Sequence, residues 1–205
     1  MNNNLIISVG RQLGSGGRIV AKMLADEFGC KFYDREVLNL AAKESGFSEE
    51  FFEKNDERKG FLDHIFHMHV PFISDSSFYD NGLSQENLFR LQSDAIRKAA
   101  EESPCVFVGR CADYVLRNHK NIVTVFITAD LDDRIANIQK LNNCSPEEAK
   151  KIISNKEESR SSYYNYYTGK TWGSSASYDL CVNSSRLGLE GTKQFIADFI
   201  HKVQK

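Results

Sequence analysis

Residues 5–18 read LIISVGRQLGSGGR, a short apolar run that ends in a turn with four glycines in eight positions. Glycine adopts φ > 0 without steric cost and lets a ligand approach the bare backbone. At the start of a helix such a turn presents unpaired N–H groups and the positive end of the helix dipole, which favours phosphate. The flanking residues Arg11 and Arg18 also favour phosphate binding, because cations without nearby carboxylates suit an anion. A tight turn that only packs strand against helix is the alternative interpretation.

The turn departs from the phosphate-binding pattern G-x-x-x-x-G-K-[ST]. Counting back from Gly16 and Gly17 places Arg11 at the first glycine of the pattern and Gly17 at its lysine. Aligning on Gly10 instead leaves Arg18 two residues late. In both alignments the lysine is missing. The spacing also departs from the G-x-G-x-x-G of dinucleotide sites.

Apolar runs alternate with helical periods along the rest of the chain, which predicts an α/β fold with a parallel sheet covered on both faces. The strands are expected at 5–9, 31–33, 104–108, 122–127 and 179–182, and flanking helices at 18–28 and 190–203. Residues 35–102 predict a helical insertion, with periodic segments at 35–43, 48–55, 61–69 and 84–100. A further helix is expected to open at Ser145-Pro146-Glu147-Glu148, a capping sequence with proline at the first helical position.

Length and composition exclude several classes of protein. The 205 residues, 23.3 kDa in mass, predict one domain, and the net charge of −2 provides no field for a nucleic acid or an anionic membrane. No segment approaches the roughly 20 apolar residues of a membrane helix, and the amino terminus does not resemble a signal peptide. Five scattered cysteines without a CxxC pair indicate reduced packing residues. We expect a cytoplasmic protein.

Five segments carry a family resemblance: ISVGRQLGSGGR at 7–18, FYDR at 32–35, VFVGR at 106–110, YYTGKTWG at 166–173 and YDL at 178–180. Together they resemble the cytidylate-kinase-like branch of the P-loop nucleoside monophosphate kinases. The resemblance implies a three-layer P-loop NTPase-type fold that uses ATP and Mg²⁺ to phosphorylate a nucleoside monophosphate, with CMP or dCMP favoured. It also implies a core at 1–34, 103–144 and 178–205, a helical acceptor-binding insertion at 35–102 and a lid at 145–177.

Phosphoryl transfer requires in-line positioning and positive charge around the moving group more than covalent help. The backbone of residues 14–17 is predicted to bind the ATP phosphates, with Arg18 as the first choice for the cation and Arg11 as the second. The residues of this segment are Gly14, Ser15, Gly16 and Gly17. Magnesium is expected to be held mainly by water and phosphate oxygens, and its protein ligands are not predicted. Residues 183–187 are the expected adenine cradle.

The resemblance places the acceptor beside Asp34, Arg35 and Arg110, and it makes Arg160 the lid arginine that closes over the transferring phosphate. Asp34 as a helix N-cap is an open alternative. Further candidates are Asp113, Lys156, Lys170 and Trp172, with surface ion pairing or ring packing as their alternative roles.

Two other functions are compatible with the sequence. The missing lysine suggests a nucleotide-binding module without phosphoryl transfer. The helical insertion at 35–102 is rich in aromatic residues and is not a recognisable copy of the cytosine-reading region, which suggests a kinase for another small phosphorylated or hydroxylated acceptor. The histidines at 64, 67 and 69 suggest surface or acceptor contacts more than a metal site. Nucleotides are the only partners expected, and the chain is predicted to be a monomer or a homodimer.

Overall fold

The computed structural model describes residues 4–34 and 85–204. The helices expected at 35–43, 48–55 and 61–69 lie outside these residues, as do Arg35 and the three clustered histidines. The other predicted strands and helices lie within them, apart from residue 84 at the start of the helix expected at 84–100.

In the described residues the sheet has five strands, all parallel, in the order β2-β3-β1-β4-β5. Their bounds are Ile6–Arg11 for β1, Lys31–Tyr33 for β2, Cys105–Val108 for β3, Ile122–Thr128 for β4 and Leu180–Asn183 for β5. The central strand β1 is apolar on both faces, with Ile6, Ile7 and Val9 fully buried. The predicted α/β fold with a parallel sheet is therefore confirmed.

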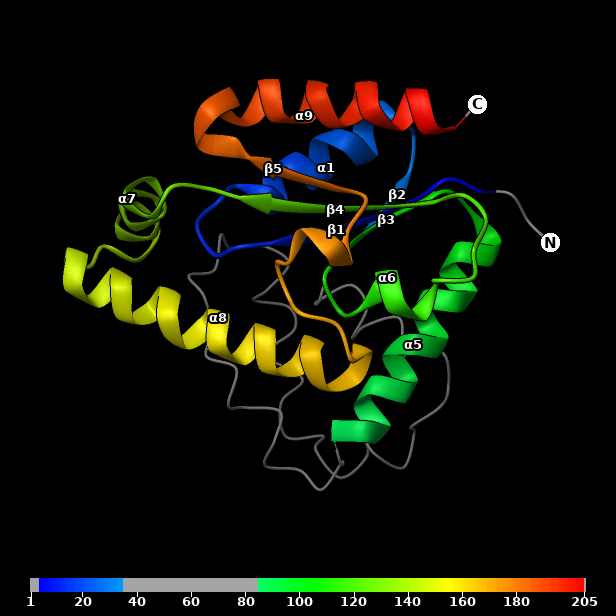
Figure 1. Ribbon diagram of the computed structural model, residues 1–205, viewed down its shortest axis with the longest axis horizontal. Helices are drawn as coiled ribbons and strands as arrows, with labels where there is room; N and C mark the ends of the chain where they lie inside the picture. Colours follow the sequence, from blue (N-terminus) through cyan, green and yellow to red (C-terminus); the bar gives the residue numbers. More distant parts are fainter. Residues whose placement is uncertain (1–3, 35–84, 205) are drawn as a thin grey trace, which may run out of the picture.

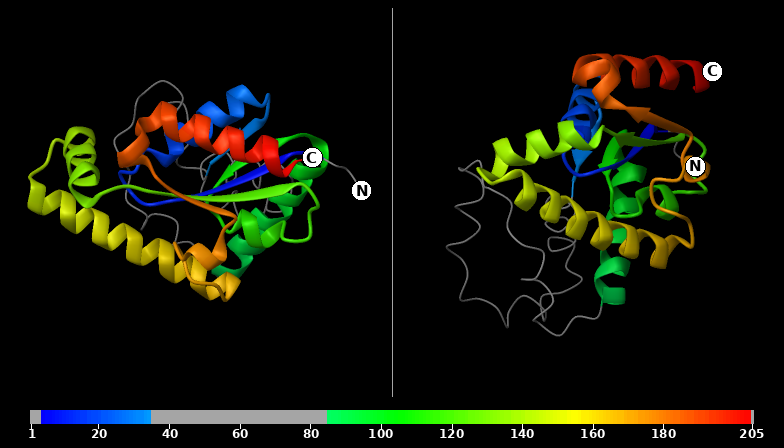
Figure 2. Two further views of the ribbon diagram at one scale, coloured as in Figure 1. Left: turned by 45° about the horizontal axis from the view of Figure 1, so that its top comes forward. Right: turned by 60° about the vertical axis from the view of Figure 1, so that its left-hand side comes forward.

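Helices cover both faces of the sheet (Figures 1 and 2). On one face α1 (Gly17–Glu27) and α9 (Ser184–Val203) bury Leu24 and Ile196 against Ile7 and Val9. On the other face α5 (Gln85–Glu102) and the short α6 (Ala112–Val115) bury Ile96 around Phe107. The result is the three-layer arrangement of an α/β sandwich.

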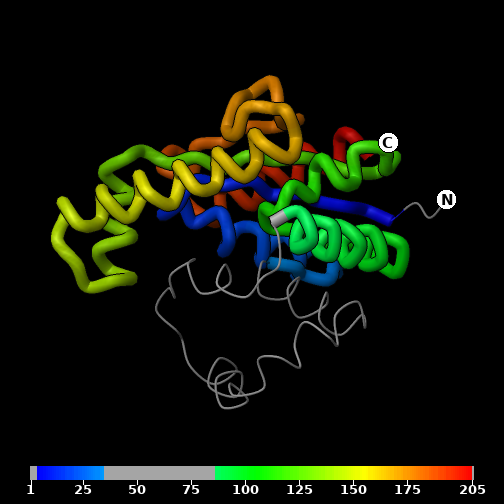
Figure 3. The backbone as a smooth tube through the Cα atoms, turned by 90° about the horizontal axis from the view of Figure 1, so that it is seen from below, coloured from blue at the N-terminus to red at the C-terminus, as the bar shows by residue number. Residues whose placement is uncertain are grey.

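Two helices continue from β4 (Figure 3). Helix α7 (Leu131–Asn142) packs against α8 (Pro146–Thr168) through Ile135 and Ile153. The α8 N-terminus is the predicted capping box, with Ser145 Oγ accepting from the Glu148 amide at 3.2 Å and Glu148 accepting from the Ser145 amide at 2.9 Å. Seen from below, α8 crosses the sheet, and a 3₁₀ turn at Ser175–Ser177 leads back to β5.

The last helix begins earlier than the sequence predicts. Instead of starting near residue 190, α9 begins at Ser184, because the Asn183 side chain accepts a hydrogen bond from the Ser185 amide and caps it. A kink at Gly188, with φ 66° and ψ 177°, then redirects the helix. The extra turn brings the α9 N-terminus to the glycine-rich loop.

Within residues 4–34 and 85–204, no helix is long and apolar enough to cross a membrane. In the same residues no three His, Cys, Asp or Glu side chains gather as metal ligands, and the five cysteines are free thiols.

Candidate active site

The loop between β1 and α1 is shaped by two left-handed glycines, Gly14 with φ 82° and Gly16 with φ 72°. Gly16 is the N-cap of α1 and supplies no side chain to satisfy the first helical amides. Within the described part of the chain, the Gly14 and Gly16 amides have no hydrogen-bond partner. The loop therefore offers unused N–H donors at the positive end of a helix.

Ser15 uses its hydroxyl inside the loop. Its Oγ donates to the Gln12 carbonyl at 2.9 Å and accepts from the Gly17 amide at 3.3 Å. Its carbonyl accepts a hydrogen bond from Ser184 Oγ at 2.8 Å, which ties the loop to the start of α9. Ser15 is consequently buried, and it holds the loop in shape.

Arg11 ends β1, and its side chain runs between two glycines. A Cβ placed on Gly17 would lie 2.6 Å from Arg11 Cβ, and a Cβ placed on Gly109 would lie 2.5 Å from Arg11 Nη1. Removal from water lowers the pKa of Arg11 to about 9, and the positive charges of Arg160, Arg110 and, more weakly, Arg18 act in the same direction, while the Asp34 carboxylate opposes them. The guanidinium thus lies in a crowded positive environment.

Arg18, on the first turn of α1, reaches the end of β2. Its Nη2 lies 2.5 Å from Asp34 Oδ2, and its Nε donates to the same oxygen at 3.0 Å. The Arg18 side chain is 64% exposed, whereas that of Asp34 is 7% exposed. Asp34 therefore brings a buried carboxylate to the carboxyl edge of the sheet, beside the loop.

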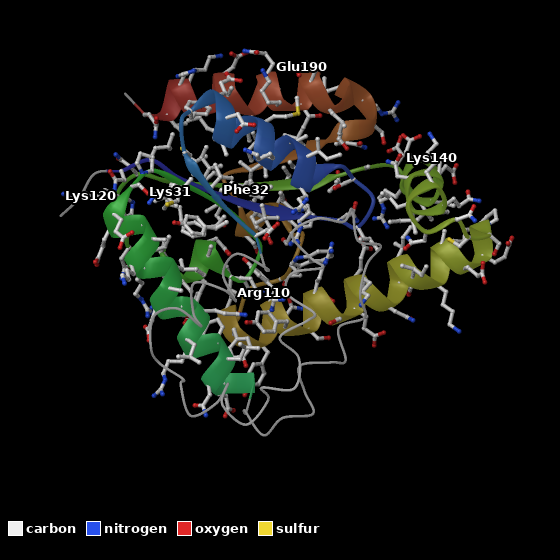
Figure 4. All side chains as sticks on the ribbon, turned by 180° about the vertical axis from the view of Figure 1, so that it is seen from behind. Lys31, Phe32, Arg110, Lys120, Lys140 and Glu190 are labelled. Atoms are coloured by element: carbon white, nitrogen blue, oxygen red, sulfur yellow. The ribbon has the colours of Figure 1, made fainter. Side chains whose placement is uncertain are left out.

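Arg110 follows β3 and lies between the sheet and α8 (Figure 4). Gly109, Arg110 and Cys111 are all left-handed, with φ of 75°, 57° and 56°. This conformation is unfavourable for the two residues that carry a Cβ, and it directs Arg110 over the ring of Tyr163, 5.4 Å from the ring centroid. Tyr163 donates to Gln92 Oε1 at 3.3 Å, and burial raises the pKa of its phenol.

Helix α8 carries Arg160 to the same place. Arg160 Nη1 donates to the Arg11 carbonyl at 3.3 Å. Three residues earlier, Glu157 pairs with Arg134 of α7 at 3.0 Å and accepts from the Leu13 amide at 3.3 Å. The Leu13 contact fastens α8 to the glycine-rich loop, and the sequence holds no signal for it because Leu13 and Glu157 are 144 residues apart.

Other candidates lie elsewhere in the molecule. Trp172 packs edge-on against Phe126 of β4 at 5.1 Å, so its ring contacts the sheet core. Tyr164 donates to the buried Asp113 carboxylate at 2.7 Å, which joins α8 to α6. Lys170 lines a cavity of about 290 Å³ with Asp113 and Asp179 near the start of β4. The glycine-rich loop lies at the opposite, carboxyl end of that strand.

The structure thus brings four of the predicted arginines to one edge of the sheet, with the Asp34 carboxylate beside them. A family model described as "Cytidylate kinase-like family" matches residues 6–186. The chain belongs to the cytidylate kinase-like family. The match spans the loop, Asp34, both strand-end arginines and α8, and it confirms the resemblance drawn from the sequence motifs.

Relatives of this cytidylate kinase-like chain are distant. It is 28% identical over 191 residues to the cytidylate kinase of Pyrococcus horikoshii, covering 92% of this chain and 84% of that protein. It is 24% identical to the cytidylate kinase of Methanocaldococcus jannaschii, covering 98% and 100% of the two chains. These proteins carry the name of an enzyme, so the chain is a cytidylate kinase-like phosphotransferase by family.

Solved structures show the same fold. An uncharacterised protein from Eubacterium ventriosum superposes with a TM-score of 0.74 at 24% identity, over 97% of this chain and 99% of that one. Shikimate kinase from Bacteroides thetaiotaomicron superposes with a TM-score of 0.53 at 14% identity, over 96% and 98% of the two chains. The cytidylate kinase-like chain therefore shares its fold with other kinases.

Proposed function

We propose that this protein transfers the γ-phosphoryl group of ATP to a nucleoside monophosphate, with CMP or dCMP as the acceptor. The observation that carries the proposal is the convergence of Arg11, Arg18, Arg110 and Arg160 beside a loop with unused amide donors. Like charges repel in a shared site unless anions separate them. Two phosphorylated substrates supply that negative charge.

On the ATP side, the amides of Gly14 and Gly16 at the α1 N-terminus bind phosphate oxygens, together with the neighbouring backbone of Ser15 and Gly17. Ser184, which donates to both the Ser15 and Thr128 carbonyls, holds residues 183–187 next to this loop. That proximity supports the segment as the place where the adenosine end of ATP rests.

On the acceptor side, Arg110 binds the acceptor phosphate, and Asp34 faces the acceptor from the end of β2. The Tyr163 ring beneath Arg110 and its hydrogen bond to Gln92 hold the guanidinium in place. Arg160 approaches from α8, which acts as the lid. Its contact with the Arg11 carbonyl supports a position over the bond that is made and broken.

Magnesium accompanies ATP in this proposal. The position that carries a serine or threonine in the standard loop is Arg18, and the Ser15 hydroxyl is already bonded within the loop. Asp34 is the buried carboxylate at this edge among the described residues. This donor set fits a cation that keeps most of its ligands as water and phosphate oxygens, as Mg²⁺ does, and that supplies charge neutralisation.

The chemistry needs no covalent intermediate on the protein. The arginines hold the acceptor oxygen in line with the γ-phosphorus and offset the charge that builds on the equatorial oxygens. One such contact removed from a transition state typically lowers the rate by about 100 to 1,000-fold. The expected role of the chain is therefore positioning and electrostatic stabilisation.

The test is acceptor-dependent ADP release measured over CMP, dCMP, UMP, AMP and a panel of small alcohols. We expect turnover with CMP or dCMP, and a loss of about 100-fold in Arg110→Ala. Arg97→Ala is the matched control, because Arg97 pairs with Asp94 on the surface of α5. ATP binding with no turnover for any acceptor would overturn this proposal in favour of a binding module, and turnover with an alcohol alone would replace the acceptor class.

A further inference from the structure

The glycine-rich loop exchanges two residue types relative to the standard phosphate-binding pattern. Where that pattern begins with glycine, this chain has Arg11, and where the pattern has lysine, this chain has Gly17. The cationic residue and the glycine are therefore exchanged between these two positions of the loop. The structure shows whether the two positions share the same space.

The two positions are in contact. A Cβ on Gly17 would lie 2.6 Å from Arg11 Cβ, 3.2 Å from Arg11 Cγ and 3.3 Å from Ile127 Cβ. A distance under about 3 Å between carbon atoms is a steric overlap. The stem of Arg11 therefore fills the volume into which a side chain at position 17 would start, and glycine at 17 is a condition for Arg11 to lie there.

The far end of the Arg11 side chain leads to the end of β3. Its Nη1 lies 2.5 Å from the position of a Cβ on Gly109, and Gly109 precedes Arg110, which lies between the sheet and α8 (Figure 4). Among residues 4–34 and 85–204, no carboxylate forms an ion pair with Arg11. Arg160 and Arg110 are the strongest charged neighbours of its guanidinium and both are positive, whereas the Asp34 carboxylate acts on it more weakly than either.

Arg18 is placed differently. Its guanidinium holds the buried Asp34 carboxylate in two hydrogen bonds, and its side chain is largely exposed. An arginine engaged with a carboxylate has less free charge to offer a phosphate than one surrounded by other cations.

We propose that Arg11 performs the role of the missing loop lysine by reaching the β- and γ-phosphates through the space that glycine leaves at position 17. Arg18 then acts as a positioning residue for Asp34. The inference rests on the proposed function, because it names the cation of the same ATP site, and it changes the order of preference that the sequence suggested.

The key variants are Arg11→Met, which keeps the packed stem but removes the charge, and the double variant Arg11→Gly/Gly17→Lys, which restores the standard pattern. Gly17→Lys alone is the steric control, since its Cβ meets Arg11. Arg97→Met is the control for loss of an arginine elsewhere. Each variant is checked for folding by circular dichroism. Affinity is measured by calorimetry with ATP and with inorganic tripolyphosphate in the presence of magnesium, and turnover by acceptor-dependent ADP release.

We expect Arg11→Met to weaken both ATP and tripolyphosphate at least tenfold, the scale of one lost charge-assisted hydrogen bond. Its turnover is expected to fall by about 100-fold. The double variant should recover at least tenfold over Arg11→Met in both readouts, whereas Gly17→Lys alone should not. Arg97→Met should match the wild type.

Three results would overturn the inference. They are a folded Arg11→Met variant with wild-type affinity for tripolyphosphate, a folded double variant that recovers nothing, and a wild type that binds neither ATP nor tripolyphosphate. A wild type that binds both probes through Arg11 but phosphorylates no acceptor would sink the proposed function alone and support this assignment.

Discussion

Arg11 occupies the space that glycine leaves at position 17, and its guanidinium carries a free-energy cost in the folded protein. A guanidinium that is removed from water and surrounded by Arg110 and Arg160 raises the free energy of the folded protein. The folded-state pKa of Arg11 lies below its unfolded value, so the folded chain binds this proton more weakly than the unfolded chain does. The penalty is therefore fully present below about pH 9 and diminishes as the pH rises through that value.

Arg11→Met should accordingly raise the melting temperature of the nucleotide-free protein by a few degrees at pH 7, because the stem still packs and the charge is gone. Differential scanning calorimetry measures the shift. Arg97→Met provides the baseline for removing a surface arginine. A melting temperature below that of the wild type would show that Arg11 is compensated in the folded state.

Tyr164 is a second residue for which one atom, the side-chain hydroxyl oxygen, should contribute measurably to the unfolding free energy. Its hydroxyl donates to Asp113 at 2.7 Å, and burial raises the pKa of this carboxyl while the hydrogen bond opposes the rise. Tyr164→Phe should cost about 1–3 kcal/mol of unfolding free energy, since a buried acceptor loses its donor. Urea denaturation tests this, with the exposed Tyr166→Phe as the control. Equal midpoints for the two variants would contradict the expectation.

Among the elements, α8 links three parts of the molecule. Its first turns pack on α7, its middle contacts the glycine-rich loop through Glu157 and Arg160, and its last turns meet α6 through Tyr164. These contacts join α8 to both α7 and α6 and to the loop that is expected to bind phosphate.

Glu157→Gln should weaken that link. The change removes the charge that pairs with Arg134, whose side chain is 5% exposed, and about 1.5–3 kcal/mol of stability should be lost with it. The KM for ATP should also rise, because the Leu13 amide is held less firmly. Denaturant unfolding and steady-state kinetics provide the two readouts. Glu158→Gln, on the exposed side of α8, should change neither, and a Glu157→Gln enzyme that behaves like it would refute the linking role.

For the whole molecule, the site gathers cations from separate layers of the fold. Arg11 and Arg110 come from strand ends, Arg18 from α1 and Arg160 from α8, yet the chain carries a net charge of only −2. The positive field is therefore local, and a polyanion bound there contacts elements from both faces of the sheet.

Bound ATP should thus stabilise the whole domain, by about 2.7 kcal/mol at a concentration one hundred times its dissociation constant. At a fixed ATP concentration the rise in melting temperature should shrink between 50 and 500 mM salt, since screening weakens the attraction of phosphate to the arginines. Thermal shift measurements at several salt concentrations test this. A rise independent of salt would indicate that binding relies on adenine and not on the arginine cluster.

Much of this architecture is predictable from local sequence. The apolar runs, the Ser145 capping sequence and the helix after the loop appear in the structure within a few residues of their predicted bounds. The strand order could not be predicted, because parallel pairing joins segments distant in the chain. The early start of α9 at Ser184 could not be predicted either, because it depends on a single hydrogen bond from the Ser185 amide to the Asn183 side chain. The sequence predicted five site arginines, of which Arg35 lies outside the described residues. Only the tertiary structure shows that Arg18 holds Asp34 while Arg11 lies closest to the charges of Arg160 and Arg110.

The left-handed stretch at 109–111 has a consequence for evolution in the laboratory. Arg110 and Cys111 each hold a conformation that costs an L-residue about 1–2 kcal/mol, whereas glycine adopts it freely. A population screened for heat tolerance alone would favour glycine or asparagine at position 110, and it would lose the guanidinium that we propose for the acceptor phosphate. Mutant libraries that select for thermostability should therefore keep the codon for Arg110 unchanged.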